Sequence, residues 1–471
     1  MCLPGPRSYL SICSKPGVRW VNGKTQSVDF SQTAAEFSSY ITGRLKMDTD
    51  LSSARVPDPD PQTAWRYTRA YFDQALDASL GIVQRTWFEK HLTAHQAGLV
   101  SDTSATWLAL RSVVFAAGCR IELSKSQTFR KASKQAWRYF ETALAVYARL
   151  IFLKTSIMGV QALTLMAVQI IDDDEITCAL PQHVNNGSAS NLAYCHSLIR
   201  LSQLLSRSEK RLSTARYLRS GGKLLMEAIA ELQGELDSVR DTLNQSFDLQ
   251  LGQCLQPASL PPLVSLDQLL YLHYAYLNAT LSIHTVLSYP WLRALTGLHS
   301  QETSEMQTNQ SAESVARAAR AAILLTEHIN LRAHTTLPVA YFGPVYAMTS
   351  LFVYCLDEGA DVCSLALLDV ATGYFARLQL ATGAVVPARV ARELSSLAHR
   401  YHQAPQDTSL NSTSSPNDPE LAGGGLGAEY YDQLWDPGDI GNPLPLDFED
   451  WSALLPVSSE EDPINLELWQ S

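Results

Sequence analysis

Thr106–Lys125 has the sequence TWLALRSVVFAAGCRIELSK, and this stretch decides the expected fold. Its apolar side chains recur every three or four positions, which places them on one face of an α-helix. The residues on this face are Trp107, Leu110, Val114 and Ala117. The pattern therefore predicts a helix with one side turned to a hydrophobic core.

Two further helical patterns follow before Pro181. The first of them has a face formed by Trp137, Phe140, Leu144, Tyr147 and Ile151. The next, SIMGVQALTLMAVQII (Ser156–Ile171), is apolar almost all round, as expected of a helix buried on every side. We expect these three helices to form the centre of the core.

The rest of the chain shows helical periodicity and lacks alternating strands bounded by hairpin turns. We therefore expect an all-α fold, a multi-helix bundle-like domain followed by a disordered acidic C-terminal tail. The expected divisions are an irregular N-terminal segment and linker (1–60), an all-helical middle region (61–402), a Ser/Pro/Gly-rich linker (403–428) and an acidic-aromatic tail (429–471).

Turn residues are dense in the first sixty residues. Pro16-Gly17 and Asn22-Gly23 are typical of loops, so at most a short helix is expected there, near Ala34–Leu45. The run VPDPDP (Val56–Pro61) is typical of a linker.

Charge is distributed unevenly along the 471 residues. The net charge is −11, and residues 401–471 carry fourteen Asp and Glu with no Lys or Arg, which leaves +3 for residues 1–400. A near-neutral body argues against a strongly basic nucleic-acid surface, and an acidic end of this kind is typical of an interaction tail. The hydrophobic share of 46% is enough for one large core or two smaller ones.

The eight cysteines are scattered and form no CxxC pair. This spacing fits neither a disulfide framework nor a zinc finger, and it favours reduced, buried thiols. The N-terminus lacks the apolar run of a signal peptide, and no apolar stretch reaches the ~18 residues that span a bilayer. We therefore expect no membrane partner.

The C-terminal tail mixes acids with bulky apolar residues, as in DFEDWSALLP and NLELW. The predicted partner-binding anchors are Phe448, Trp451, Leu454, Leu455 and Trp469, and the first four fall on one side of a helix if one forms. Acidic neighbours keep such side chains solvated while leaving them available to a hydrophobic groove. The pattern favours an activation-type segment; a tail that docks back on the body is the alternative.

Two groups of residues raise the question of metal binding. His91 and His95 lie four apart, but HLTAH lacks the Glu of HExxH and has no third ligand in view. The acidic run Asp172–Glu175 is of the type that binds Mg²⁺ in α-helical prenyl-diphosphate enzymes. Its register disagrees with that motif, because Asp173 is followed three residues later by Ile176. A metal-dependent enzyme is therefore an unfavoured alternative.

Motifs of hydrolases, nucleotide-binding loops and dinucleotide folds are absent from the sequence. We therefore expect no enzyme and no catalytic, cofactor-binding or metal-binding residue in this chain. Basic residues cluster at Arg120–Arg138 and Arg207–Arg219. They could contact phosphates or an import receptor, but a solvated helix face is the favoured interpretation.

Four stretches resemble the fungal transcription regulators that carry an N-terminal binuclear zinc cluster and a long helical middle region. Ser11–Thr25 looks like the segment that follows the cluster, and Trp107–Phe129 and Ser156–Val168 look like the start of the middle region. Ile170–Pro181 resembles its acidic segment. The resemblance covers most of residues 10–400. It implies a nuclear transcription regulator whose helical body receives a signal and whose acidic tail binds transcription machinery or a coactivator.

The sequence departs from this family in two places. The six-cysteine cluster is absent, because Cys2 and Cys13 cannot supply six closely spaced thiolates. Helices that the family has between its counterparts of Val168 and Ile170 are missing. The resemblance thus implies zinc and DNA binding only if the missing cluster is supplied. A clusterless interaction protein that pairs with related regulators, as a homodimer or heterodimer, is the second hypothesis.

Overall fold

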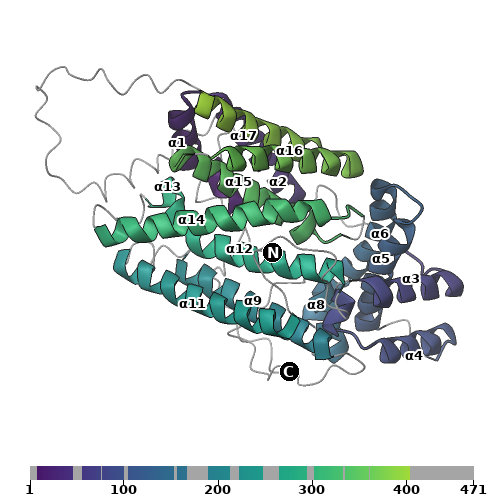
Figure 1. The fold of residues 1–471 in the computed structure, drawn as a ribbon. Helices are drawn as coiled ribbons and strands as arrows, with labels where there is room; N and C mark the ends of the chain where they lie inside the picture. Colours follow the sequence, from purple (N-terminus) through teal and green to yellow (C-terminus); the bar gives the residue numbers. More distant parts are fainter. Residues whose placement is uncertain are drawn as a thin grey trace, which may run out of the picture.

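The computed structural model describes residues 8–45, 56–75, 77–99, 104–152, 156–166, 189–212, 222–247, 265–293, 302–332, 335–359 and 361–403. Within these ranges the regular elements are helices and there is no strand, which confirms the all-α fold class (Figure 1). The expected linker and tail beyond Gln403, and the acidic run near Ile170, lie outside the described residues.

The helices follow one another along the chain in two groups. The first group is α1 (Lys15–Thr25), α2 (Asp29–Leu45), α3 (Pro61–Gln74), α4 (Arg85–Gln96), α5 (Ala105–Leu123), α6 (Phe129–Leu144), α7 (Tyr147–Phe152) and α8 (Ile157–Met166). The second is α9 (Ala189–Leu212), α11 (Gly222–Phe247), α12 (Leu266–Ser288), α13 (Pro290–Arg293), α14 (Glu302–Leu324), α15 (Gly343–Asp357), α16 (Val362–Thr382) and α17 (Val385–Gln403). Short 3₁₀ or π turns are η1 (Tyr9–Cys13), η2 (Asp77–Leu80), η6 (Leu325–His328) and η7 (Pro338–Phe342).

Helices α3 to α8 share the smaller of two hydrophobic cores, with α5 at its centre. Trp107, Leu110 and Val114 are fully buried, as the periodicity predicts, and α5 also buries most of its remaining surface. Helix α3 crosses α5 at Gly118, where an added Cβ would come within 2.0 Å of the Tyr67 carbonyl oxygen. The glycine is therefore required by the close approach of the two backbones.

Two expectations about this smaller core are wrong in detail. In α6 the expected face is only partly buried: Trp137 is 44% exposed, and Phe140 packs at the edge of the core. The buried face carries Ala136, Tyr139 and Ala143 instead. The alanines let α6 approach α5 closely, and the Tyr139 ring packs edge-on against Phe115 of α5 with centroids 6.3 Å apart. In α8, Ile157 is 82% exposed, so this helix is not buried on every side.

The larger core surrounds α12, and its members are η1, α1, α2 and α9 to α17. In Figure 1, α11 and α9 lie below α12, and α14, α15, α16 and α17 lie above it. The Tyr274 hydroxyl of α12 donates to the Ala322 carbonyl of α14 at 2.8 Å. At Gly343, an added Cβ would be 2.3 Å from the Tyr274 ring, so α15 can pass α12 only because this residue lacks a side chain.

The N-terminal segment is helical where loops are expected, which corrects the sequence interpretation. Ser14 caps α1, and Pro16 lies in its first turn, where the missing N–H of a proline has no cost. Pro16-Gly17 thus marks a helix start, and Asn22-Gly23 lies within the same helix. Both α1 and α2 pack against the C-terminal end of the body, with ion pairs from Arg389 to Glu36 and from Lys24 to Asp357. The expected boundary at residue 60 stays a prediction.

One apolar helical segment, Pro338–Asp357, is long enough by composition to cross a membrane, contrary to the expectation from the sequence. It continues past Pro344 because this proline lies in the first turn of α15, after the π turn η7. Some 78% of its apolar window is buried among the other helices. Such burial is typical of a core helix.

Candidate functional site

The residues that the sequence nominates for partner binding lie outside the described part of the chain. These are the tail anchors Phe448, Trp451, Leu454, Leu455 and Trp469. The acidic run Asp172–Glu175 lies outside it as well. Both therefore stay predictions, and the site that the structure can describe is in the helical body.

The two histidines of HLTAH are engaged in ring packing and in a hydrogen bond to a carboxylate. The His91 ring stacks on Trp87 with centroids 5.1 Å apart and meets Trp107 edge-on at 4.4 Å. His95 Nε2 lies 3.0 Å from Asp58 Oδ2. In the described ranges, no group of three or more His, Cys, Asp or Glu could hold a metal ion. Burial, together with nearby His95, lowers the pKa of His91, which keeps its ring neutral.

Asp58 joins two helices of the smaller core. Its Oδ2 accepts from Arg111 Nε of α5 at 2.8 Å, in addition to the contact with His95 of α4. Arg111 is completely buried, and its guanidinium lies 5.8 Å from the Trp107 ring centroid. The Asp58 carboxylate therefore fixes the run Val56–Pro61 to the helical bundle. The interpretation of this run as a linker did not predict this contact. A lone arginine inside an apolar helix was the available signal, because buried arginines need partners.

The basic clusters divide into three kinds of environment. Arg120 is largely buried near Asp77, and burial lowers its pKa. Arg207 and Arg211 of α9 pair with Glu235 and Glu231 of α11 on the surface. The remaining cluster, on α6, comprises Arg130, Lys131, Lys134 and Arg138, which are exposed and make no ion pair with described residues. Among the described residues of the two clusters, this last group has the expected character of a solvated basic face.

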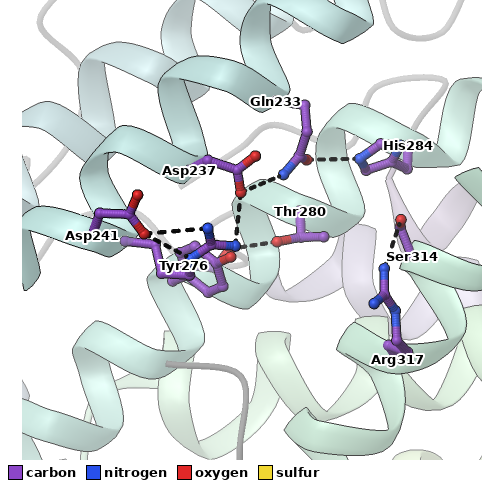
Figure 2. Close-up of polar contacts among 9 residues, drawn as sticks. Gln233, Asp237, Asp241, Tyr276, Thr280, His284, Ser314 and Arg317 are labelled. Atoms are coloured by element: carbon purple, nitrogen blue, oxygen red, sulfur yellow. Dashed lines mark hydrogen bonds and ion pairs between the residues drawn. The ribbon is translucent and has the colours of Figure 1, made fainter. Parts of the chain in front are cut away.

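A buried histidine lies where α11, α12 and α14 meet (Figure 2). His284 Nε2 is 2.8 Å from Gln233 Oε1, and its Nδ1 is 3.1 Å from Ser311 Oγ. The Gln233 amide oxygen can only accept, so Nε2 carries the proton and Nδ1 accepts from the serine. Burial, aided by Arg317, lowers the pKa of His284 to about 4, and the ring is neutral near pH 7.

The chain of hydrogen bonds continues from this histidine to the surface of α11. Gln233 Nε2 donates to Asp237 Oδ1 at 3.0 Å, and Arg240 Nη1 lies 2.8 Å from the same oxygen. Figure 2 shows Asp241 on the far side of this group, where it also contacts Arg240 at 3.2 Å. The network links three helices. It contains a serine that donates to a neutral histidine, but Ser311 is 1% exposed and His284 7%, so a substrate has no access to the pair. The network therefore supports structure and polarity rather than covalent chemistry.

A small cavity of about 10 Å³ lies between α2, α15, α16 and α17. Thr349 is the polar side chain of a lining that is otherwise apolar. This volume is about the room that one water molecule needs, and it is far below the roughly 300 Å³ at which small-molecule pockets usually start. The cavity therefore gives no independent reason to assign a ligand.

These features define a class: a helical bundle whose described residues hold interhelical polar networks and no catalytic or metal-binding constellation. The chain is similar to two fungal proteins named "ABC-transporter-regulating transcription factor", from Aspergillus fumigatus and Aspergillus oryzae. Each is 21% identical over 463 aligned residues, which cover 79% of this chain and 51% of the relative. The chain thus spans about half the length of the curated relatives it matches.

Comparisons with family models and with solved structures gave no match. The distant similarity to the two Aspergillus proteins supports a place for this chain among fungal transcription factors.

Proposed function

We propose that this chain is a transcription regulator of the fungal zinc-cluster type, acting in the nucleus. One observation carries the proposal: an all-α body that aligns along most of its length with two transcription factors. The names of the relatives favour a protein without enzymatic activity.

In this proposal the helical body receives a regulatory signal and the acidic tail recruits transcription machinery or a coactivator. The anchors would be Phe448, Trp451, Leu454, Leu455 and Trp469, whose apolar side chains suit a hydrophobic groove while the acids keep the free tail solvated. The 471 residues contain no six-cysteine cluster, so zinc and sequence-specific DNA binding would come only with a cluster supplied from elsewhere.

The decisive experiment fuses residues 425–471 to a neutral DNA-binding module and measures a reporter in a fungal host. We expect activation, and we expect replacement of Phe448, Trp451, Leu454 and Leu455 by alanine to remove most of it. A matched control replaces Ser452, Ser458 and Ser459 by alanine, which leaves every acid and every anchor in place. A wild-type fusion without reporter activity would contradict the proposed role of the tail.

A second candidate is an interaction protein that pairs with related regulators and has no DNA-reading role of its own. It is favoured by the combination of a packed helical body with a sequence that lacks the cluster. In a gel-shift titration at physiological salt, both candidates predict no discrimination between DNA sites by this chain alone. They differ in a pull-down, where only the second requires capture of a full-length related regulator.

The enzyme hypothesis has a simple test. If Asp172–Glu175 bound Mg²⁺–diphosphate, the chain would show metal-dependent turnover of prenyl diphosphates that Asp172→Ala abolishes. We expect no turnover in either protein.

A further inference from the structure

The start of α6 places two basic residues directly before a serine. The segment Phe129–Gln135 reads FRKASKQ, with Arg130 three positions and Lys131 two positions before Ser133. Both bases are exposed, and neither makes an ion pair with a described carboxylate. In the part of the chain that the structure describes, no other serine or threonine has Lys or Arg at both of these positions. The surroundings of Ser133 are therefore distinctive within the helical body.

This spacing matches a known way of recognising a serine hydroxyl. Basophilic protein kinases bind an extended substrate segment in an acidic groove, where bases before the serine pair with carboxylates and bring the hydroxyl to the γ-phosphate of MgATP. An arginine is well suited to such a pair, because its guanidinium binds a carboxylate through two hydrogen bonds. A motif of four residues also recurs by chance, so the hydroxyl must in addition be accessible in the fold.

The Ser133 hydroxyl is not used by the fold. Serine and threonine in helices often donate to the carbonyl four residues earlier, as Thr142 of the same helix does to Arg138 at 3.2 Å. Ser133 makes no hydrogen bond with a described residue, and its side chain is half-buried. Its neighbours one turn away along the helix surface are Arg130 and Trp137, both exposed. The hydroxyl therefore lies at the edge of the exposed face, and its reaction breaks no hydrogen bond of the body.

The segment around Ser133 can open without disrupting the smaller core. A kinase binds its substrate in extended form, so Phe129–Gln135, about two turns of helix, must unwind. Ala132 is the only fully buried side chain in this segment, so the opening takes one small side chain out of the core. The N-cap residue Thr128 makes no side-chain hydrogen bond to the first turn, which leaves this end of α6 less stable than a capped one. Local opening here is therefore expected to cost less than unfolding of the core.

We propose that Ser133 is a phosphorylation site for a basophilic protein kinase. Ser133 Oγ attacks the γ-phosphorus of MgATP, so that the Oγ–P bond forms and the bond from this phosphorus to the bridging oxygen breaks. ADP leaves, and the hydroxyl proton passes to the catalytic aspartate of the kinase. The new phosphate carries about −1.5 to −2 charge at pH 7 and lies one turn from Arg130. It therefore cancels about half of the four positive charges on the exposed face of α6.

The first test incubates the full chain with MgATP and the catalytic subunit of cyclic-AMP-dependent protein kinase, and maps the phosphate by mass spectrometry. Ser213, outside the described residues, also follows two bases, Lys210 and Arg211, so the experiment uses a Ser213→Ala background. We expect near-stoichiometric phosphate at Ser133 and its loss in Ser133→Ala. A folded chain that receives no phosphate at Ser133 overturns the proposal.

Charge variants show whether the kinase reads the two bases before the serine. Arg130→Gln should slow phosphorylation of Ser133 about tenfold or more, because it removes a charge-assisted pair with the kinase. Arg138→Gln is the matched control: it removes the same charge from the same face but lies after the serine, and it should leave the rate unchanged. Circular dichroism checks that both variants stay helical. Equal slowing by the two variants would indicate general attraction to a basic surface and would refute the assignment.

Hydrogen exchange tests the opening that the reaction requires. The amides of residues 133–135 should exchange faster than those of residues 113–115, which lie in the buried helix α5. This measurement needs neither a variant nor a kinase. If both groups of amides exchanged at the same rate, the start of α6 would open only when the whole core unfolds, and the folded chain would not present Ser133 to a kinase.

Discussion

Asp58→Ala should destabilise the smaller core measurably, because it removes the carboxylate beside a buried cation. The Arg111 side chain is 0% exposed and that of Asp58 is 30% exposed, with 2.8 Å between Nε and Oδ2. Breaking a fully buried pair costs about 3–5 kcal/mol, whereas an exposed pair is worth about 0–1 kcal/mol. Since water reaches one partner, we expect an intermediate loss of about 2 kcal/mol in the free energy of unfolding.

The assay is urea unfolding followed by tryptophan fluorescence, to which Trp107 contributes from within the same cluster. A loss of about 2 kcal/mol corresponds to a midpoint shift of about 1 M for an m-value near 2 kcal/mol/M. Asp73→Ala is the control, since Asp73 and its partner Arg85 are 51% and 42% exposed. If both variants lowered stability equally, Asp58 would be an ordinary surface acid and the argument for a buried ionic clamp would fail.

Three further predictions concern other parts of the molecule. Gly118→Ala should lower the free energy of unfolding by more than about 2 kcal/mol or block folding, because the new Cβ would overlap the Tyr67 carbonyl. Gly234→Ala, where a Cβ meets nothing, should stabilise α11 by about 0.5–1 kcal/mol. Thermal unfolding of the two variants compares these effects directly. Folding lowers the pKa of His284 from 6.5 to about 4. Between these two pH values the unfolded chain binds a proton at this histidine and the folded chain does not, so the free energy of unfolding falls as the pH drops from 6.5 to 4. His284→Gln should remove on the order of 3 kcal/mol of this pH-dependent loss of stability. If the variant showed the same dependence of stability on pH, His284 would not be the group responsible. In the reporter fusion, the tail with its four alanines should lose most activity while its acids remain.

The helical periodicity of the sequence carried much of the prediction of the fold. The spacing in Thr106–Lys125 correctly indicates a helix with Trp107 and Val114 in the core. Local caps agree with the starts of other helices, as where Ser265 and Gln268 form a capping box at α12. These features are local, because a helix is closed by contacts between residues three or four positions apart.

Predictions that require knowing a neighbour are less reliable. The periodicity places Trp137 on the buried face of α6, but the face buried against α5 carries Tyr139 and alanines. The Trp137 indole instead donates to Glu141 at 2.8 Å on the outside. Hydrophobicity ranks the tryptophan above the alanines, whereas close helix packing favours the smaller residues. The candidate site shares this difficulty: Asp58 and Arg111 are 53 positions apart, and neither spacing nor composition joins them.

The sequence by itself determined that this protein is helical, where most of its helices run, and that an acidic, aromatic tail follows a nearly neutral body. These properties depend on composition and on short-range periodicity, which the chain carries wherever it folds. Only the tertiary structure decided which helix faces are buried, that α1 and α2 close against α17, and that α16 leaves Val370 and Leu380 exposed. Burial depends on the shapes of all the surfaces that meet at a helix, and those surfaces come from residues far apart in the sequence.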